Sequence, residues 1–399
     1  MTIDTICASC IEALRNAGYN ESTIFNYEGV IRRFKEFCKE RDVNKYSCEI
    51  GKQYADDVIS KKTGKFSLNR YHTHGRFIRL IDSYLNTGKF DFSILKKGKI
   101  SPDNHRHKII YADYHKYLHS EYENENTIHF YEYGMYCLLQ FLNKYDVAEL
   151  EQLEADMVIR YLQETKQTRQ REVLCELRGI LRYLGRNDLL TTVAGIHAPR
   201  IKRIIPTLSD DENQKIKEAI NSGKVTLRDA AIVISGLSCG IRACDLIRLR
   251  LSDIDWNNET ISFKQSKTGN LVCLPLTPMV GNSIARYILG ERPTANNDFI
   301  FVRQLAPYTP LSDHSACHAI VSRVFRKAGI DKDNRIFGMH MLRHNAASTM
   351  VKNEVPIETI SAILGHSSPD TTDIYITTDE IRLRDCVLPM LGISKEVNP

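Results

Sequence analysis

Long apolar runs are missing from this sequence. No stretch reaches the roughly 20 consecutive apolar residues that a membrane-spanning helix needs, so we expect no contact with a membrane. The opening residues MTIDTICASC lack the basic and then apolar pattern of a secretory signal. The eleven cysteines show no repeating spacing of the kind that marks a disulfide framework. These absences favour a cytoplasmic protein with reduced thiols.

A large excess of charge of either sign is also absent. The net charge of +5 is only mildly basic, so bulk charge alone does not indicate a nucleic-acid binder. Residues 1–107 carry 19 Lys+Arg against 13 Asp+Glu, whereas residues 108–199 carry 10 against 14. The bases in the later half of that acidic stretch are Arg160, Lys166, Arg169, Arg171, Arg178, Arg182 and Arg186. They predict either a side that faces DNA or an ordinary solvated helix face.

Two groups of residues have metal-like types. The first is a C-x-x-C with two cysteines further along: Cys7, Cys10, Cys38 and Cys48. The second lies on a single predicted helix face: Asp313, His314, Cys317 and His318. Core cysteines on helices explain the first group better, and no further motif supports the second. We therefore predict no metal and no cofactor, and the absence of a G-x-x-x-x-G-K-[ST] phosphate loop agrees with chemistry that needs no ATP.

An internal repeat organises the first half of the chain. T-I-F-N-Y-E-G at 23–29 matches T-I-H-F-Y-E-Y at 127–133, at an offset of 104 residues. A second match, at an offset of 102, pairs the residues from Arg76 with those from Arg178. Apolar residues recur in both copies at the spacing of an amphipathic helix. We therefore predict a duplicated helical module.

Two linkers divide the chain into three predicted domains. Gly, Ser-Pro and polar residues interrupt the helical pattern at 98–108, and two prolines with three basic residues mark 197–209. The predicted domains are 1–104, 105–199 and 205–399.

The last domain has a mixed pattern. Ser209 and Asp210 offer an N-cap for a first helix. Further helices are predicted over 226–239, 243–250, 277–289, 313–328, 341–353 and 356–364. Alternating residues between Glu259 and Leu276 predict a β-hairpin with a Gly-containing turn. The expected fold class is therefore mainly α with a small β-hairpin or sheet in the last domain (α+β).

Breaking a phosphodiester bond requires cations on the phosphate oxygens, a nucleophile and a proton donor. Arg242 follows a Gly turn at a helix start, and Asp245 lies one turn on, where it could orient the guanidinium. Arginine suits phosphate because its planar fork meets two oxygens at once. Lys267 lies at the hairpin turn as a flexible cation. His340 and Arg343 are three residues apart and share a helix face.

The remaining candidates follow the last predicted helix. Gly365 has the character of a left-handed C-terminal glycine, His366 comes next, and Tyr375 lies nine residues later. A neutral tyrosine, with a pKa of about 10, is a poor nucleophile, and nearby cations would favour its phenolate. His344, four residues after His340, stays an alternative imidazole for the phosphate.

Each of these residues alone is a weak signal, but their joint order is specific. The set is Arg242, Lys267, His340, Arg343, His366 and Tyr375. Here the sequence resembles the tyrosine recombinase family, the phage integrases and transposon recombinases, over about residues 205–380. The resemblance implies that the two helical modules are SAM-like DNA-binding domains placed before a catalytic domain.

The resemblance also implies roles and partners. The scissile phosphate would be bound by Arg242, His340, Arg343 and His366. Lys267 would protonate the leaving 5′-oxygen, and Tyr375 would form a 3′-phosphotyrosyl bond, so that integration or excision needs neither ATP nor metal. Expected partners are double-stranded DNA sites, further copies of the chain in a tetramer, and accessory DNA-bending or directionality proteins.

Several alternatives stay open. A type IB topoisomerase uses the same kinds of residue but only relaxes supercoils. An idle DNA-binding protein on the same fold is a third reading, against which the complete set of six residues argues. The first module would hold an accessory DNA site or extend the clamp on the core site. The apolar tail after Tyr375 would dock on its own domain or on a neighbouring protomer.

Overall fold

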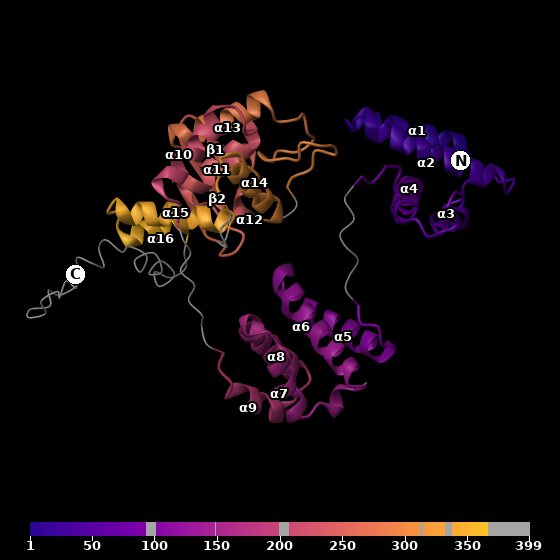
Figure 1. Ribbon diagram of the computed structural model, residues 1–399, viewed down its shortest axis with the longest axis horizontal. Coiled ribbons are helices and arrows are strands. Elements are labelled where there is room, and N and C mark those ends of the chain that lie inside the picture. The colour runs from indigo at the N-terminus through magenta and orange to yellow at the C-terminus, as the bar shows by residue number, and fades with distance from the viewer. Residues whose placement is uncertain (93–100, 148, 199–206, 312–313, 332–336, 366–399) are drawn as a thin grey trace, which may run out of the picture. The chain divides into compact units, whose positions relative to one another are not determined.

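The computed structural model describes residues 1–92, 101–147, 149–198, 207–311, 314–331 and 337–365 (Figure 1). Helices dominate these ranges and one small antiparallel sheet accompanies them, which confirms the predicted α+β class. Within the described ranges, no helix combines the length and apolar character needed to cross a bilayer. The predicted site residues His366 and Tyr375, and the apolar tail, lie outside them.

The chain divides into two compact units, residues 94–203 and the residues on either side of that range. Three large hydrophobic cores are built, respectively, around Phe34, Leu138 and Ile232, all of which are fully buried. One core falls within each of the three predicted domains. The domain division itself remains a prediction.

Four helices enclose the core of residues 1–92. They are α1 (Ile3–Asn16), α2 (Glu21–Lys39), α3 (Cys48–Ala55) and α4 (Leu68–Thr87). Each begins after a polar residue whose side chain accepts a hydrogen bond from an N–H of the first turn: Thr2, Asn20, Ser47 and Ser67. The ring of Phe34 meets those of Tyr54 and Phe77 edge-on in the centre of the core.

Residues 101–198 repeat that local structure. Their helices are α5 (His105–Glu121), α6 (Glu125–Lys144), α7 (Ala155–Glu164), α8 (Gln170–Tyr183) and α9 (Asn187–Ala194), with 3₁₀ turns at Leu150–Gln152 and Gln167–Arg169. Asn20 and Asn124, 104 residues apart, cap α2 and α6 in the same way. Asp42 and Asp146, at the same offset, both adopt a left-handed backbone with φ of 54° and 57°. The sequence repeat is therefore also a repeat of helix starts and turns.

The last region contains seven α-helices and a three-stranded sheet within its described ranges. The helices are α10 (Asp210–Asn221), α11 (Leu227–Cys239), α12 (Ala243–Leu246), α13 (Pro278–Gly290), α14 (His314–Lys327), α15 (Met339–Lys352) and α16 (Ile357–Leu364). A 3₁₀ turn spans Leu251–Asp253, and the strands are β1 (Ile254–Asp255), β2 (Thr260–Lys264) and β3 (Leu271–Pro275). Ser209 caps α10 through a capping box with Glu212, as the sequence suggested.

The predicted hairpin is confirmed, because β2 and β3 pair antiparallel with Ile261 opposite Leu274. Strand β1, which the sequence analysis missed, adds to the other edge of β2. The helix predicted over 243–250 is wrong in its second half, since α12 ends at Leu246. The chain leaves the helix there because Arg250 forms a β-bridge with Phe299.

Helix α11 lies at the centre of this region and packs against α13, α14 and α15. A buried ion cluster fixes it: Asp229 accepts hydrogen bonds from Arg228 Nε at 3.2 Å and from Arg323 Nε at 2.7 Å. Arg228 also donates to the carbonyl of Val302 at 3.2 Å. These bonds satisfy charges that would be costly to bury alone, and they hold in place the helix whose C-terminal end contributes to the candidate site.

The cysteines of the C-x-x-C group are core residues on helices. Cys7, Cys10 and Cys38 are buried in the first core. Burial raises the pKa of Cys7 and of Cys10 to about 12, and that of Cys38 to about 11. A zinc ligand must be a thiolate, which such burial disfavours. In the second metal-like group, Asp313 lies outside the described residues.

Candidate active site

Two of the predicted phosphate-binding arginines meet at the C-terminal end of α16. Arg343, on α15, is buried, and it donates to the carbonyls of Gly240 and Leu364, each at 2.8 Å. Arg242, at the start of α12, donates to the carbonyl of Gly365 at 3.3 Å. Since Leu364 and Gly365 are consecutive, one turn of backbone brings the two guanidiniums together.

Gln265 fixes the first arginine to the hairpin, and the sequence analysis missed this residue. Its Oε1 accepts hydrogen bonds from Arg242 Nη1 and from Thr268 Oγ1, both at 2.7 Å. Its Nε2 donates to the carbonyl of Leu364 at 3.1 Å. The side chain is buried, so these bonds satisfy an amide that would otherwise be costly to bury. Its place directly after a strand, two residues before Lys267, was the available clue.

Asp245 has a different task from the one expected of it. Its Oδ1 accepts a hydrogen bond from the backbone N–H of Ser266 at 2.7 Å, so it supports the hairpin turn and not the Arg242 guanidinium. The physical reason is burial: Asp245 is 2% exposed, and the turn offers its carboxylate a backbone donor. Within the described residues, no carboxylate forms an ion pair with Arg242. Its positive charge therefore remains uncompensated by these neighbours.

His340, Lys267 and His344 form the other side of the site. His340 lies in the first turn of α15 and stays exposed, and Lys267 is exposed in the turn between β2 and β3. The pKa of His340 is lowered from its ordinary value by partial burial of its ring and then by the positive charges of Arg343 and Lys267. Its Nε2 lies 3.2 Å from Nε2 of the buried His344. A neutral His340 at pH 7 follows from this shift.

Four of the six predicted site residues thus come from three separate segments that meet. Arg242 follows α11, Lys267 belongs to the hairpin, and His340 and Arg343 belong to α15. His366 and Tyr375 lie outside the described residues, but the carbonyl of Gly365, the residue directly before His366, accepts from Arg242.

Gly365 offers a test of this arrangement. It ends α16 in the left-handed conformation, with φ 61°, as the sequence predicted, and a Cβ placed there would lie 2.2 Å from Nε2 of Gln265. We expect Gly365→Ala to lower the free energy of unfolding by about 1–2 kcal/mol from backbone strain. It should also displace the Gln265 amide from Arg242 and so reduce DNA cleavage by about tenfold or more. Urea unfolding and a cleavage assay measure the two effects.

Gly223→Ala is the matched control for that substitution. Gly223 has φ 73°, and a Cβ there would meet nothing within 4 Å. It should therefore show the backbone strain without the loss of cleavage. Equal cleavage by the two variants would contradict the positioning role of Gln265.

Comparison with known proteins follows from this geometry. Residues 206–381 match the phage integrase family. A putative integrase/recombinase of Sinorhizobium fredii, y4gC, is 35% identical over 170 residues, which cover 42% of this chain and 86% of that protein. The chain belongs to the phage integrase family.

Membership of the phage integrase family confirms the resemblance that the sequence motifs suggested. A second putative integrase/recombinase from the same organism, y4rF, is 28% identical over 222 residues and 54% of this chain, which spans only 52% of that relative's length. The crystal structure of a lambda integrase tetramer bound to a Holliday junction matches 79% of this chain and 90% of its own, with a TM-score of 0.52 at 20% identity. That likeness shows a shared fold. The roles of the six site residues remain predictions.

Proposed function

We propose that this phage integrase family member is a site-specific DNA recombinase that cuts and rejoins strands through a 3′-phosphotyrosyl bond at Tyr375. One observation carries the proposal. The guanidiniums of Arg242 and Arg343 are held by the consecutive carbonyls of Leu364 and Gly365, directly before His366 in the sequence. Two cations so close together, held by neutral groups, suit a phosphate.

The partners of Arg242 support a phosphate-binding role. Within the described residues it donates to one amide oxygen and one carbonyl oxygen, and so uses two of its five N–H groups. Neither partner carries a charge, so the guanidinium keeps its full attraction for an anion. Donors fixed in advance by such bonds stabilise the negative charge of a phosphoryl transition state without having to reorganise.

The proposed reaction is a transfer between two oxygens. The Tyr375 hydroxyl oxygen attacks phosphorus and gives up its proton, and the bond between phosphorus and the 5′-oxygen breaks. The Lys267 ammonium gives a proton to that departing oxygen, whose alcohol form has a high pKa. His340, neutral at pH 7, donates a hydrogen bond to a phosphate oxygen while His344 faces it at 3.2 Å. Attack by a 5′-hydroxyl of another strand reverses these steps and reseals the DNA.

The proposed partners are double-stranded recombination sites and further copies of this chain. The lambda integrase that shares this fold forms a tetramer on a Holliday junction, and a tetramer is the assembly that exchange between two duplexes calls for. Accessory DNA-bending or directionality proteins, a cytoplasmic location and a phage or transposon element as the carrier complete the proposal.

The basic residues of the second module divide into two groups. Three are used inside the module: Arg169 pairs with Glu176 at 3.0 Å, Arg178 donates to the carbonyl of Val193 at 3.2 Å, and Arg186 pairs with Asp188 at 2.7 Å. The expectation of one DNA-facing side is too wide for these three, because each satisfies buried or terminal groups of its own module. The exposed ones are Arg160, Lys166, Arg171 and Arg182.

Two of the exposed residues test the DNA-facing side. Arg171 and Arg182 lie on α8, eleven residues or three turns apart, so they share one face of the helix. Replacing both with Ala should weaken duplex binding by about tenfold and lower the slope of log K against log salt by about 1.8, or 0.9 for each phosphate contact. Fluorescence anisotropy at several salt concentrations measures both quantities. Lys215→Ala, on α10, is the control, and an unchanged slope in the double variant would exclude these residues from the interface.

An exchange assay separates recombination from supercoil relaxation. Footprints of the purified protein on the DNA that flanks its own gene would supply the site, and two duplexes carrying that site, of different length, would then be mixed. Recombination predicts products that join arms of both duplexes. Relaxation of a supercoiled plasmid without any joined product would favour the topoisomerase alternative, and binding without cleavage would favour the idle DNA-binding protein.

A further inference from the structure

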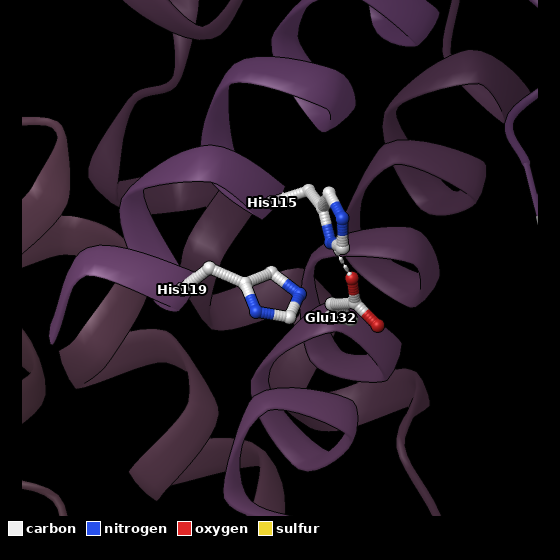
Figure 2. A group of neighbouring side chains, drawn as sticks. All are labelled: His115, His119 and Glu132. Carbon is white, nitrogen blue, oxygen red and sulfur yellow. Dashed lines mark hydrogen bonds and ion pairs between the residues drawn. The ribbon is translucent and has the colours of Figure 1, made fainter. Parts of the chain in front are cut away.

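The second module contains a cluster of metal-ligating side chains far in sequence from the proposed active site. His115 and His119 are one turn apart on α5, and Glu132 lies on the adjacent helix α6 (Figure 2). One nitrogen of each imidazole and one carboxylate oxygen all lie within 4.8 Å of one another. In the described part of the chain, no other group of three His, Cys, Asp or Glu side chains meets that condition.

The carboxylate at the centre of the cluster is buried without a permanent cation. Glu132 is 7% exposed. Its Oε1 pairs with Nδ1 of His115, and its Oε2 lies 3.2 Å from Nδ1 of His129 on the same helix. Among the described residues it has no Lys or Arg partner, and a histidine is charged only when protonated. Because an ionised carboxylate is costly to bury without a counter-charge, the site lacks a cation at pH 7.

The two α5 histidines are arranged as ligands more than as packing residues. Their rings are nearly perpendicular, with centroids 4.3 Å apart, and Figure 2 shows both rings beside the carboxylate. His119 is exposed and makes no hydrogen bond to another described residue. A single histidine would satisfy Glu132, so a purely structural role leaves His119 and His129 unexplained.

The charge of Glu132 is also felt by neighbouring phenols. Burial, then the charge of Glu132 and then Tyr136, raise the pKa of Tyr111 to about 12. Tyr111 lies one turn before His115 on α5, and Tyr136 one turn after Glu132 on α6. Both phenols are therefore neutral at pH 7 and do not compensate the carboxylate.

We propose that His115, His119 and Glu132 bind a divalent transition-metal ion of the zinc class, with the fourth position taken by His129 or water. Two imidazoles and a carboxylate are a donor set that Zn²⁺ accepts, whereas Mg²⁺ and Ca²⁺ require mostly oxygen ligands. Ligand atoms of a tetrahedral zinc site lie roughly 3.3–3.5 Å apart, for bonds of about 2.0–2.1 Å. Rotation of the exposed His119 closes the difference from the present spread.

The metal would act as a cross-link between α5 and α6. These two helices contribute Tyr114 and Leu138 to the core of the module, and an ion held by both would restrict their separation. It would also add two positive charges to the acidic half of the module.

Zinc titration of the full-length chain tests the proposal. Calorimetry would be done after removal of metal with a chelator, in a background in which the exposed Cys48, Cys175 and Cys273 and the C-terminal Cys386 are replaced with serine. We expect one equivalent of Zn²⁺ to bind, and His119→Ala to weaken binding by at least about tenfold. His119 is exposed, so this variant should fold normally. His105→Ala, an exposed histidine on the same helix, is the matched control.

Hydrogen exchange provides a local readout that depends on neither DNA nor catalysis. Zn²⁺ should slow amide exchange in peptides from α5 and α6 of the parent chain and of His105→Ala, and should have no such effect on His119→Ala. The absence of saturable binding to the parent chain would overturn the proposal. Equal binding by His119→Ala and His105→Ala would overturn it as well. Either result leaves the proposed recombinase activity untouched.

Discussion

Tyr375→Phe is expected to abolish the covalent protein–DNA adduct while leaving DNA binding within about threefold of the parent chain. The phenol oxygen is the atom that would bond to phosphorus, and phenylalanine removes only that atom. Loss of a nucleophile typically reduces rates by about 10⁴–10⁶-fold, so no adduct should be detectable. A duplex nicked near the cleavage point traps the adduct, because the short leaving strand diffuses away before it can reverse the reaction.

The adduct can be measured by its reduced mobility in a denaturing gel and by the peptide that carries the nucleotide. Tyr71→Phe, an exposed tyrosine on α4, is the matched control and should form the adduct at the parent rate. An adduct that persists in Tyr375→Phe would show that another residue is the nucleophile. Loss of DNA binding in the variant would instead point to a structural role for the phenol.

Arg343→Lys is expected to produce the second largest loss, about 10²–10³-fold in the rate of cleavage. Lysine keeps the charge but not the planar fork, which here donates to the carbonyls of Gly240 and Leu364 at 2.8 Å. Losing preorganised donors at a developing negative charge costs about this much in other enzymes. The free energy of unfolding should also fall by about 1–3 kcal/mol, because a buried carbonyl would lose its donor.

Single-turnover cleavage of the nicked duplex measures the rate, and urea unfolding followed by the single tryptophan, Trp256, measures stability. Arg250→Lys is the control, since Arg250 pairs with Asp298 at the surface of the same region, and an exposed pair contributes little. A cleavage rate within threefold of the parent in Arg343→Lys would rule out the proposed role of this guanidinium at the phosphate.

Local features of the fold were predictable because neighbouring residues decide them. Alternation between Glu259 and Leu276 is enough to indicate a hairpin, and the left-handed end of α16 follows from a glycine that carries no Cβ. The duplication was also visible, since Asn20 and Asn124 start their helices by the same local capping bond. None of these features depends on residues far away in the sequence.

The errors have the opposite origin. Asp245 was assigned to Arg242 by helical spacing, but its carboxylate meets the N–H of Ser266, 21 residues later. Three basic residues of the second module are used within that module, as shown by the pair of Arg169 with Glu176. Which charges pair is decided by packing between elements, and spacing along one helix does not contain that information.

By itself, the sequence determined the fold class, the repeated module and the order of residues that marks the phage integrase family, because periodicity, capping and turn chemistry act over a few residues. Only the tertiary structure decided that Gln265 holds Arg242, that Arg343 joins the ends of α11 and α16, and that two histidines of α5 meet Glu132 of α6. Those contacts join residues that are 13 to 103 positions apart in the chain. Their partners are selected when helices and strands pack together and each buried polar group must find a bond.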